Sequence, residues 1–408
     1  MRLRTRLTWW LLGERKASRT WPLLAAFSAG GGARFMDRRF ESFAKEGYRK
    51  NVVAYRCISM LAQSAASVPW GVFRELTKLD DGPLVRLIRR PNPWQGWGDF
   101  FEAFVAFYLI AGDSFVEAVG PDSGPPRELY TLRPDRMKLE LNQATGAPAA
   151  YLFELGGRRR RWDMDPVTGA GPILHWRTFN PLDPWNGQSP VDPAAFAIDQ
   201  HNSAGAWNQA LLQNGASPSG ALVYAPKDGP TELTEAQLAR LKEQIDDQFT
   251  GPRNAGRPFL LEGGMDWRAM GLSPKDMDWI KGKDVSAREI ALAYGVPSQL
   301  LGIPDAQTFA NYREARLSFW EDTVIPLLDR ARDAINAWFA QWWPELRLRY
   351  DLDGVPALTL RRQRKADGLR GLVEAGILTV NEARDELGFE AVAGGDARAG
   401  AQRPEQPA

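Results

Sequence analysis

Two histidines and three closely spaced pairs of aspartates are the side chains in this sequence best suited to binding a metal ion or moving a proton. They are His175, His201, Asp163/Asp165, Asp276/Asp278 and Asp351/Asp353. A catalytic zinc site takes ligands at spacings such as HExxH, and none occurs here. A calcium site needs roughly six to eight oxygen ligands, whereas each aspartate pair lacks companion acids nearby. We expect structural histidines, solvated aspartates and no metal site.

Two short motifs look like catalytic loops but depart from them at a required position. GQSPV at 187–191 is similar to a nucleophile elbow, yet Val191 stands where the second glycine is needed. KGKD at 281–284 lacks the upstream glycine of a phosphate-binding loop, and Asp284 replaces the hydroxyl that would hold magnesium. The single cysteine, Cys57, allows no intramolecular disulfide. We therefore expect no enzyme and no cofactor.

Basic residues cluster in two places, although the formal net charge of the chain is only +1. The first fifty residues hold twelve lysines and arginines against four acids, which is typical of arms that touch phosphates or lipid head groups. Four arginines at 158–161 follow the turn glycines Gly156 and Gly157. These arginines either bind phosphate or coat the solvent face of a hairpin, and both interpretations stay open. The apolar runs near the N-terminus are far shorter than the roughly 20 residues that span a bilayer.

The first half of the chain alternates helical and strand patterns. Residues 51–68 carry apolar positions at helical spacing, and the strand-like WGVFRE follows. A second apolar helix stops at Gly112 and leads into a strand over 114–119. Short runs punctuated by glycine, proline and asparagine then predict further strands. Residues 51–190 thus form one α+β domain.

Two helices flank a small insert in the second half. The first covers about 193–213 and has Phe196, Gln200 and Trp207 on one side. The insert at 221–272 combines strands with the helix TEAQLARLKEQIDDQF. The second helix begins at Ser273 and ends at Gly295. The pattern describes a two-helix arm that holds a small α+β head.

A long helix and two short ones complete the chain. An apolar stripe over 308–343, to which Trp338 and Trp342 belong, predicts one helix of about 50 Å. Pro326 lies inside this stripe and has no N–H to donate, so we expect a kink there. A strand follows, and Thr379 with Glu382 forms a capping box for the last short helix. Trp207, Trp320, Trp338 and Trp342 are expected in the core or in a subunit interface.

Seven segments, taken in order, resemble the portal protein, or head-to-tail connector, of tailed bacteriophages, of the type found in long-tailed phages and gene transfer agents. They are NVVAYRCISMLAQSAASVP, LIRRPNPWQGWGDFFEAFVAFYLIAGDSFVEAV, ELYTLRPDRM, ILHWRTFNPLDPWNGQSPV, IALAYGVPSQLLGI, VIPLLDRARDAI and LVEAGILTVNEARDELGFEAV. Each segment is a weak signal alone, but their succession over about residues 50–395 is specific.

The resemblance implies an α+β, mainly helical portal fold that assembles as a ring. Composition predicts a basic N-terminal arm (1–50) and a disordered tail (393–408). Between them, the resemblance implies the wing (51–190), the first stem helix (191–213), the clip (214–272), the second stem helix (273–296), the tunnel loop (297–307), a long kinked wing helix with a strand (308–356) and a helical crown (357–392).

The resemblance also implies a function and a set of partners. Identical subunits, commonly twelve, would form a ring at one vertex of a virion or phage-like capsid, after synthesis in the bacterial cytoplasm. Double-stranded DNA would be packaged and ejected through the channel without sequence specificity. The packaging ATPase (large terminase), a tail adaptor and the major capsid protein would bind the ring. A near-neutral net charge suits this role, because phosphate contacts repeated in every subunit would stall the DNA.

The family's tunnel loop projects into the channel and supplies the first set of candidate site residues. They are Pro297, Ser298, Gln299, Leu300, Leu301, Gly302, Ile303, Pro304, Asp305 and Gln307. The two prolines stiffen the loop and the glycine provides a hinge. Our hypothesis is that copies of this loop narrow the channel and restrain backward slippage of DNA.

Charged residues of the stem and clip supply the remaining candidates. Lys275, Lys281, Lys283 and Arg288 are candidates to face DNA in the stem channel. Lys242, Arg253 and Arg257 are candidates to dock the ATPase and the tail adaptor on the clip. Two other readings stay open: a structural neck or tail ring without a DNA-valve role, and a polynucleotide-processing enzyme that uses the aspartate pairs and cleaves DNA in the presence of a divalent metal.

Overall fold

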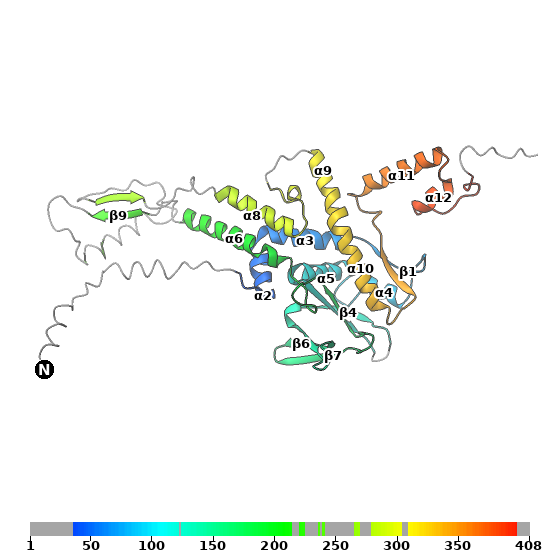
Figure 1. Ribbon diagram of the computed structural model, residues 1–408, viewed down its shortest axis with the longest axis horizontal. Coiled ribbons are helices and arrows are strands. Elements are labelled where there is room, and N and C mark those ends of the chain that lie inside the picture. Colours follow the sequence, from blue (N-terminus) through cyan, green and yellow to red (C-terminus); the bar gives the residue numbers. More distant parts are fainter. Residues whose placement is uncertain are drawn as a thin grey trace, which may run out of the picture. The chain divides into compact units, whose positions relative to one another are not determined.

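The computed structural model describes residues 36–121, 124–213, 220–224, 236, 239–240, 265–269, 279–303 and 309–397 (Figure 1). Every element below belongs to the unit that begins at Asp37. Helices predominate in it, and the strands form small antiparallel sheets. The expected fold class, α+β and mainly helical, agrees with this arrangement.

Two helices of the wing, α3 (Val52–Ala66) and α5 (Trp97–Ala111), pack side by side and form its core (Figure 1). Cys57, Ile58 and Leu61 of α3 are buried, as are Phe101 and Phe104 of α5. Burying each large apolar side chain contributes about 1.5–3 kcal/mol. The thiol of Cys57 therefore acts as a small apolar group, and burial raises its pKa to about 12.

The predicted stop at Gly112 is confirmed. This glycine has φ +81, the left-handed conformation that ends helices and that a side chain disfavours. The strand that follows is β3 (Asp113–Val119), one residue longer than predicted at its start. Helix α4 (Pro83–Arg89) precedes α5, and the 3-10 turn η2 (Pro134–Arg136) precedes β5.

Three antiparallel sheets surround these helices. The first has the order β11–β1–β2 and joins the early strands β1 (Trp70–Arg74) and β2 (Thr77–Leu79) to the late strand β11 (Leu346–Tyr350). The second has the order β4–β3–β8, with β4 at Glu128–Leu132 and β8 at Ile173–Arg177. The third has the order β5–β6–β7, with its strands at Met137–Leu141, Pro148–Leu155 and Arg158–Asp163.

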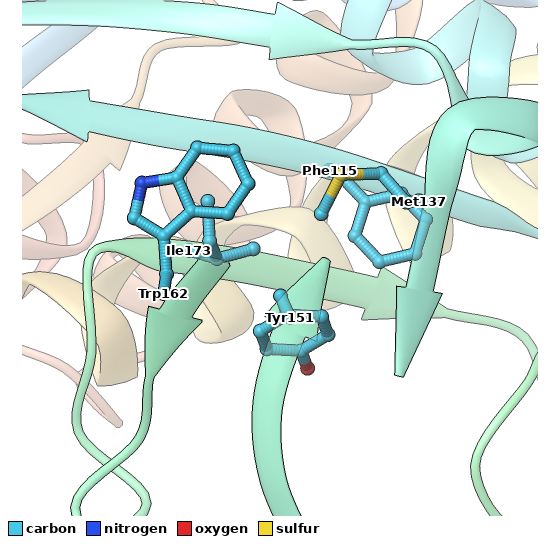
Figure 2. Close-up of a cluster of buried hydrophobic side chains, with 5 residues drawn as sticks. All are labelled: Phe115, Met137, Tyr151, Trp162 and Ile173. Carbon is cyan, nitrogen blue, oxygen red and sulfur yellow. The ribbon is translucent and has the colours of Figure 1, made fainter. Parts of the chain in front are cut away.

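A buried cluster joins the second and third sheets. Its side chains come from β3, β5, β6, β7 and β8 and point toward one another (Figure 2). The cluster consists of Phe115, Met137, Tyr151, Trp162 and Ile173. Trp162 of β7 stands between exposed residues, whereas β3 is buried on both faces around Phe115. The third sheet thus turns one apolar face to the cluster, and β3 lies inside the packed unit.

The end of the predicted N-terminal arm is helical. Helix α2 (Phe40–Ser42) continues into the π-helix η1 (Phe43–Arg49), which packs on α3 and on α6. Gly47 of η1 allows this approach, since a Cβ there would lie 3.4 Å from Val191. The predicted arm boundary at residue 50 thus falls after a helix that already belongs to the packed unit. Residues 1–35 lie outside the described range.

The segments expected to form the stem contain α6 (Val191–Gln213) and α8 (Trp279–Ala293), which run side by side in opposite directions (Figure 1). Ala194, Ala197 and Ile198 of α6 are buried, whereas Phe196 is 60% exposed. The buried face of α6 therefore includes these alanines, whereas the larger side chain of Phe196 is mostly exposed. The predicted start at Ser273 and most of the clip lie outside the described residues, apart from β9 (Gly220–Tyr224), β10 (Met265–Ala269) and a few helical positions.

The long helix is continuous from α9 (Phe309–Ser318) through the π-helix η5 (Phe319–Val324) to α10 (Ile325–Phe339). Pro326 sits just after η5, so the missing N–H and the ring are accommodated by a widened turn. Trp320 and Trp338 are buried along this helix, as the apolar stripe predicts.

The last helices are α11 (Thr359–Glu374) and α12 (Val380–Glu386). The predicted capping box is confirmed, because Thr379 accepts from Glu382 N and the Glu382 carboxylate accepts from Thr379 N. Residues 393–397 of the predicted disordered tail form turns, in which Asn381 donates to Val392 O and to Asp396. Residues 398–408 lie outside the described range.

Candidate functional site

The segment that leaves the second stem helix is held by two left-handed glycines. Gly295 has φ +63, and Val296 N donates to Ala291 O, which closes α8 with a Schellman motif. The 3-10 turn η4 (Ser298–Leu301) follows, and Gly302 (φ +71) ends it. Ile303 is buried. The first half of the candidate tunnel loop is thus a short helical turn anchored at both ends.

A hydroxyl of the long helix fixes the start of this segment. Thr323 Oγ1 lies 2.6 Å from Gly295 O and donates to it. A Cβ on Gly295 would lie 3.0 Å from the same hydroxyl oxygen, so a side chain there would push against the contact. Thr323 belongs to η5, whose π-helical turn places it opposite the end of α8. The long helix therefore positions the candidate loop directly.

The candidate stem residues lie on different sides of α8. Lys281 and Arg288 are exposed and follow the spacing 281, 285, 288 and 292, so they share one helix face with the exposed apolar residues Val285 and Leu292. Lys283 is half-buried and points to the opposite side, where it is close enough to His201 of α6 to lower the pKa of that imidazole. Two of the candidates thus share an exposed face, and the third faces the neighbouring helix.

His201 is part of the buried contact between α3 and α6. Asn51 caps α3 by accepting from Val53 N and Ala54 N, and its amide nitrogen donates to Asn202 Oδ1 at 3.1 Å. The same amide nitrogen lies 3.3 Å from His201 Nδ1. Burial, followed by the charge of Lys283, lowers the pKa of His201. This histidine is structural, as expected.

The start of the first stem helix is locked onto the end of α5. Ser189 Oγ donates to Ile110 O at 2.6 Å and accepts from Val191 N at 3.0 Å. A Cβ on Gly187 would lie 2.1 Å from Gly112 O, so the two backbones cross closer than a side chain permits. The serine of GQSPV is therefore buried and engaged in capping α6, as its departure from the nucleophile elbow suggested.

His175 of β8 belongs to a hydrogen-bond network beside the place where the backbones of Gly187 and Gly112 cross. Its Nε2 lies 2.7 Å from Asp113 Oδ1, and its Nδ1 lies 3.2 Å from the hydroxyl of Tyr151. Asp113 Oδ1 also accepts from Gly187 N at 2.8 Å. Burial raises the pKa of Tyr151 to about 12, so this hydroxyl stays protonated. The network is a buried structural one, and it links β3, β6 and β8 to the loop before α6.

The arginines at 158–161 lie on the edge strand β7, and three of the four pair with acids. Arg159 binds Glu154 at 2.8 Å, and Arg160 binds Glu117 at 2.7 Å. Arg161 binds Glu140 at 3.0 Å. Of the two open interpretations, the solvent face of a hairpin accounts for these contacts, and the charges also discourage further strand pairing at the edge.

The aspartate pairs form turns rather than a metal site. Asp165 Oδ1 accepts from Val167 N and Thr168 N, and Asp351 Oδ1 accepts from Asp353 N. Within the described residues, no group of three or more His, Cys, Asp or Glu side chains is placed to hold a metal. Asp276 and Asp278, together with Lys242, Arg253, Arg257, Lys275, Pro304, Asp305 and Gln307, lie outside those residues.

Residues 52–388 match the family described as phage portal protein. The chain belongs to the phage portal protein family. Among curated relatives of this portal-family chain, an uncharacterized protein of Rickettsia bellii is 38% identical over 354 residues, covering 86% of this chain and 90% of the relative. The portal protein of Enterobacteria phage HK97 is 24% identical over 356 residues, covering 84% and 79%.

Solved structures agree with this membership. A chain from the neck of a native gene transfer agent particle, determined with C12 symmetry, is 40% identical, with a TM-score of 0.67 and coverage of 91% of this chain and 99% of that one. An HK97-family phage portal protein from Corynebacterium diphtheriae is 15% identical with a TM-score of 0.56, and it shows the likeness of fold alone. In the part of the chain that the structure describes, no helix is both long and apolar enough to cross a membrane.

Proposed function

We propose that this protein forms the portal ring at one vertex of a phage-like capsid. The observation that carries the proposal is the likeness to the chain from the C12 neck of a gene transfer agent particle, at 40% identity over nearly the whole of both chains. Twelve copies would enclose a channel through which double-stranded DNA is packaged and ejected. The role is structural, and the subunits assemble in the bacterial cytoplasm before joining the particle.

Electron microscopy of the purified protein tests the assembly. We expect rings with a central channel and twelvefold symmetry. A protein that stays monomeric at micromolar concentration, with the wing folded by circular dichroism, would contradict the proposal. Particles produced without this protein should also lack packaged DNA.

The tunnel loop, 297–307, is the proposed DNA-facing restraint. Support comes from its anchoring, because Gly295, Thr323 and Ile303 hold its first half against the body of the subunit. A stiff loop without lysine or arginine presses on DNA without binding its phosphates tightly. Deletion of Ser298–Asp305 should give particles that form but lose part of their DNA. Particles of the deletion variant that keep full-length DNA would favour the second candidate function, a neck or tail ring without a valve role.

The clip, 214–272, is the proposed docking surface for the packaging ATPase and the tail adaptor, and the wing is proposed to contact the major capsid protein. Lys242, Arg253 and Arg257 are the clip residues proposed to make these contacts. Reversing the charge at Arg253 and Arg257 should weaken adaptor binding at least tenfold while ring assembly persists. Unchanged adaptor binding would remove these two residues from the proposal.

A further inference from the structure

A cleft with apolar walls and two arginines among its lining residues lies beside the candidate tunnel loop. Its volume is about 480 Å³, and Met60 of α3, Leu300 of η4 and Trp320 of η5 contribute to its walls. Arg56 and Arg316 are exposed at this cleft. Among the residues that the structure describes, neither guanidinium pairs with an acid. An apolar cavity with unpaired cations at its edge fits a ligand that combines apolar side chains with a carboxylate.

The loop over 178–186, between β8 and α6, presents that combination. Phe179 is 81% exposed and Leu182 is 94% exposed, although both are large and apolar. Asp183 stands next to Leu182, and hydrogen bonds from Asn186 and from Trp185 N lower the pKa of its carboxyl group. The carboxylate is therefore charged at neutral pH. Exposed apolar side chains gathered on one loop mark an interaction surface.

This loop is rigid before any partner binds. Asn180 Oδ1 accepts from Leu182 N at 3.0 Å, and Asp183 Oδ1 accepts from Trp185 N at 2.8 Å, so two Asx turns follow one another. The guanidinium of Arg177 lies 5.8 Å from the centre of the Trp185 ring. A loop already held in one shape loses little conformational entropy on binding.

We propose that the loop over 178–186 of one subunit inserts into the cleft lined by Met60, Leu300 and Trp320 of the next subunit in the ring. Phe179 and Leu182 fill the apolar cleft, and Asp183 faces Arg56 and Arg316. The inference rests on the proposed ring assembly. The insert and the cleft are different surfaces of one chain, so the contact is heterologous and propagates around a ring until it closes.

Cysteine cross-linking tests the contact because the chain has one native cysteine, Cys57, which is buried. In the full-length protein, Leu182→Cys is combined with Gln63→Cys, an exposed position in the cleft. A short bis-maleimide should then give a ladder of covalent oligomers up to the full ring. The matched control joins Gln63→Cys to Val167→Cys, since Val167 is 91% exposed on another loop. This control should give no ladder.

Each outcome bears on a different claim. Rings that form while both introduced cysteines react with a monofunctional maleimide, yet give no ladder, would overturn the loop-and-cleft contact and leave the proposed portal function standing. A wild-type protein that forms no ring at all would overturn the proposed function itself. The two failures are therefore distinguishable in one set of samples.

A second set of variants measures how much the contact contributes to ring assembly. Phe179→Ser with Leu182→Ser should lower the fraction of protein in rings at least tenfold at a fixed concentration, because side chains central to an interface carry most of its energy. Arg56→Gln with Arg316→Gln should act in the same direction. If the serine variants form rings normally but fail to enter particles, the loop binds another structural protein and the proposal is wrong.

Discussion

Gly112 and Gly187 lie where two backbone segments cross at the base of the first stem helix. A Cβ on Gly112 would lie 2.5 Å from the carbonyl carbon of Gln188, and Gly112 also needs φ +81. Around the crossing, Thr178 Oγ1 donates to Gln188 O, and Asp113 accepts from Gly187 N. These short polar contacts add to the apolar packing of Val191, Ile198 and Ile290, which are fully buried.

Replacing Gly187 by alanine should therefore destabilise the protein by about 2 kcal/mol or more, because the crossing backbones must separate. Denaturant unfolding at one protein concentration measures this change. The matched control is Gly205→Ala in α6, where a Cβ meets nothing within 4 Å. That substitution should be neutral or stabilising by up to about 1 kcal/mol. Equal losses in both variants would contradict the argument.

His201 makes the stability of the fold depend on pH. Its folded-state pKa is lowered by burial and then by Lys283, so the unfolded chain binds a proton more readily than the folded one. Stability should fall as the pH drops below the ordinary histidine value of about 6.5, and the loss should end below the lowered folded pKa. Unfolding curves between pH 7.5 and 5 would measure the slope. His201→Gln should reduce that slope, and an unchanged slope would exclude this histidine as its source.

At the scale of elements, α8 divides its charged residues between two environments. Lys281 and Arg288 share an exposed face with Val285 and Leu292, whereas Lys283 points toward α6. Ala287 and Ile290 of α8 are buried. Since a helix fixes the relative directions of its side chains, all of one face reaches the same surroundings in an assembled ring.

We expect the exposed cations Lys281 and Arg288 to differ in function from Lys283. Lys281→Glu with Arg288→Glu should change DNA retention in particles and its dependence on salt, because an exposed face is open to a partner or to DNA. Lys283→Gln should leave retention unchanged and raise the pKa of His201, which NMR titration would follow. A retention defect in the Lys283 variant alone would reverse this assignment.

The π-helical turn η5 shows how one element positions another. Pro326 cannot donate to the carbonyl of Asp322, and the helix meets this by widening over Phe319–Val324. The widened turn carries Thr323, whose hydroxyl binds Gly295 O. The proline thus affects the candidate tunnel loop through the register of the long helix.

At the scale of the whole molecule, the late strand β11 closes the wing. It pairs with β1 over five residues, from Trp70 opposite Tyr350 to Arg74 opposite Leu346. The chain therefore leaves the region expected to be the wing through α6 and returns to it with the long helix, where Trp338 Nε1 donates to Gly171 O. Helices α6 and α8 contact each other directly, so we expect the wing and stem to keep their packing without the segment between them.

A shortened chain tests this independence. Helices packed side by side lie about 8–10 Å apart, and a flexible linker of about six residues spans that distance. Replacing residues 214–278 by such a linker should leave the wing folded and remove adaptor binding. Circular dichroism and a pull-down with the adaptor would measure the two properties. An unfolded product would show that the wing depends on the replaced segment.

Helix ends and caps, which depend on local geometry, were predictable from the sequence. Gly112 and Gly295 end their helices and Thr379 caps another, because left-handed glycines and capping hydroxyls act within a few residues. The seven segments that resemble portal proteins, taken in their order along the chain, identified the family correctly. Helical periodicity also predicted one long helix over 308–343, which the structure shows over 309–339. Near Pro326, where a kink was expected, the helix contains the π-helical turn Phe319–Val324.

The contacts between elements that lie far apart in the sequence follow from the tertiary structure alone. Spacing places Phe196 on one side of α6 but does not say that the small alanines make the packed side. It leaves Arg158–Arg161 open to phosphate or to solvent, whereas contacts with Glu117, Glu140 and Glu154 come from other strands. The crossing of Gly187 over Gly112 joins residues 75 positions apart. Such contacts depend on how the elements pack, and the residue pattern within one element does not show which distant residues will be its neighbours.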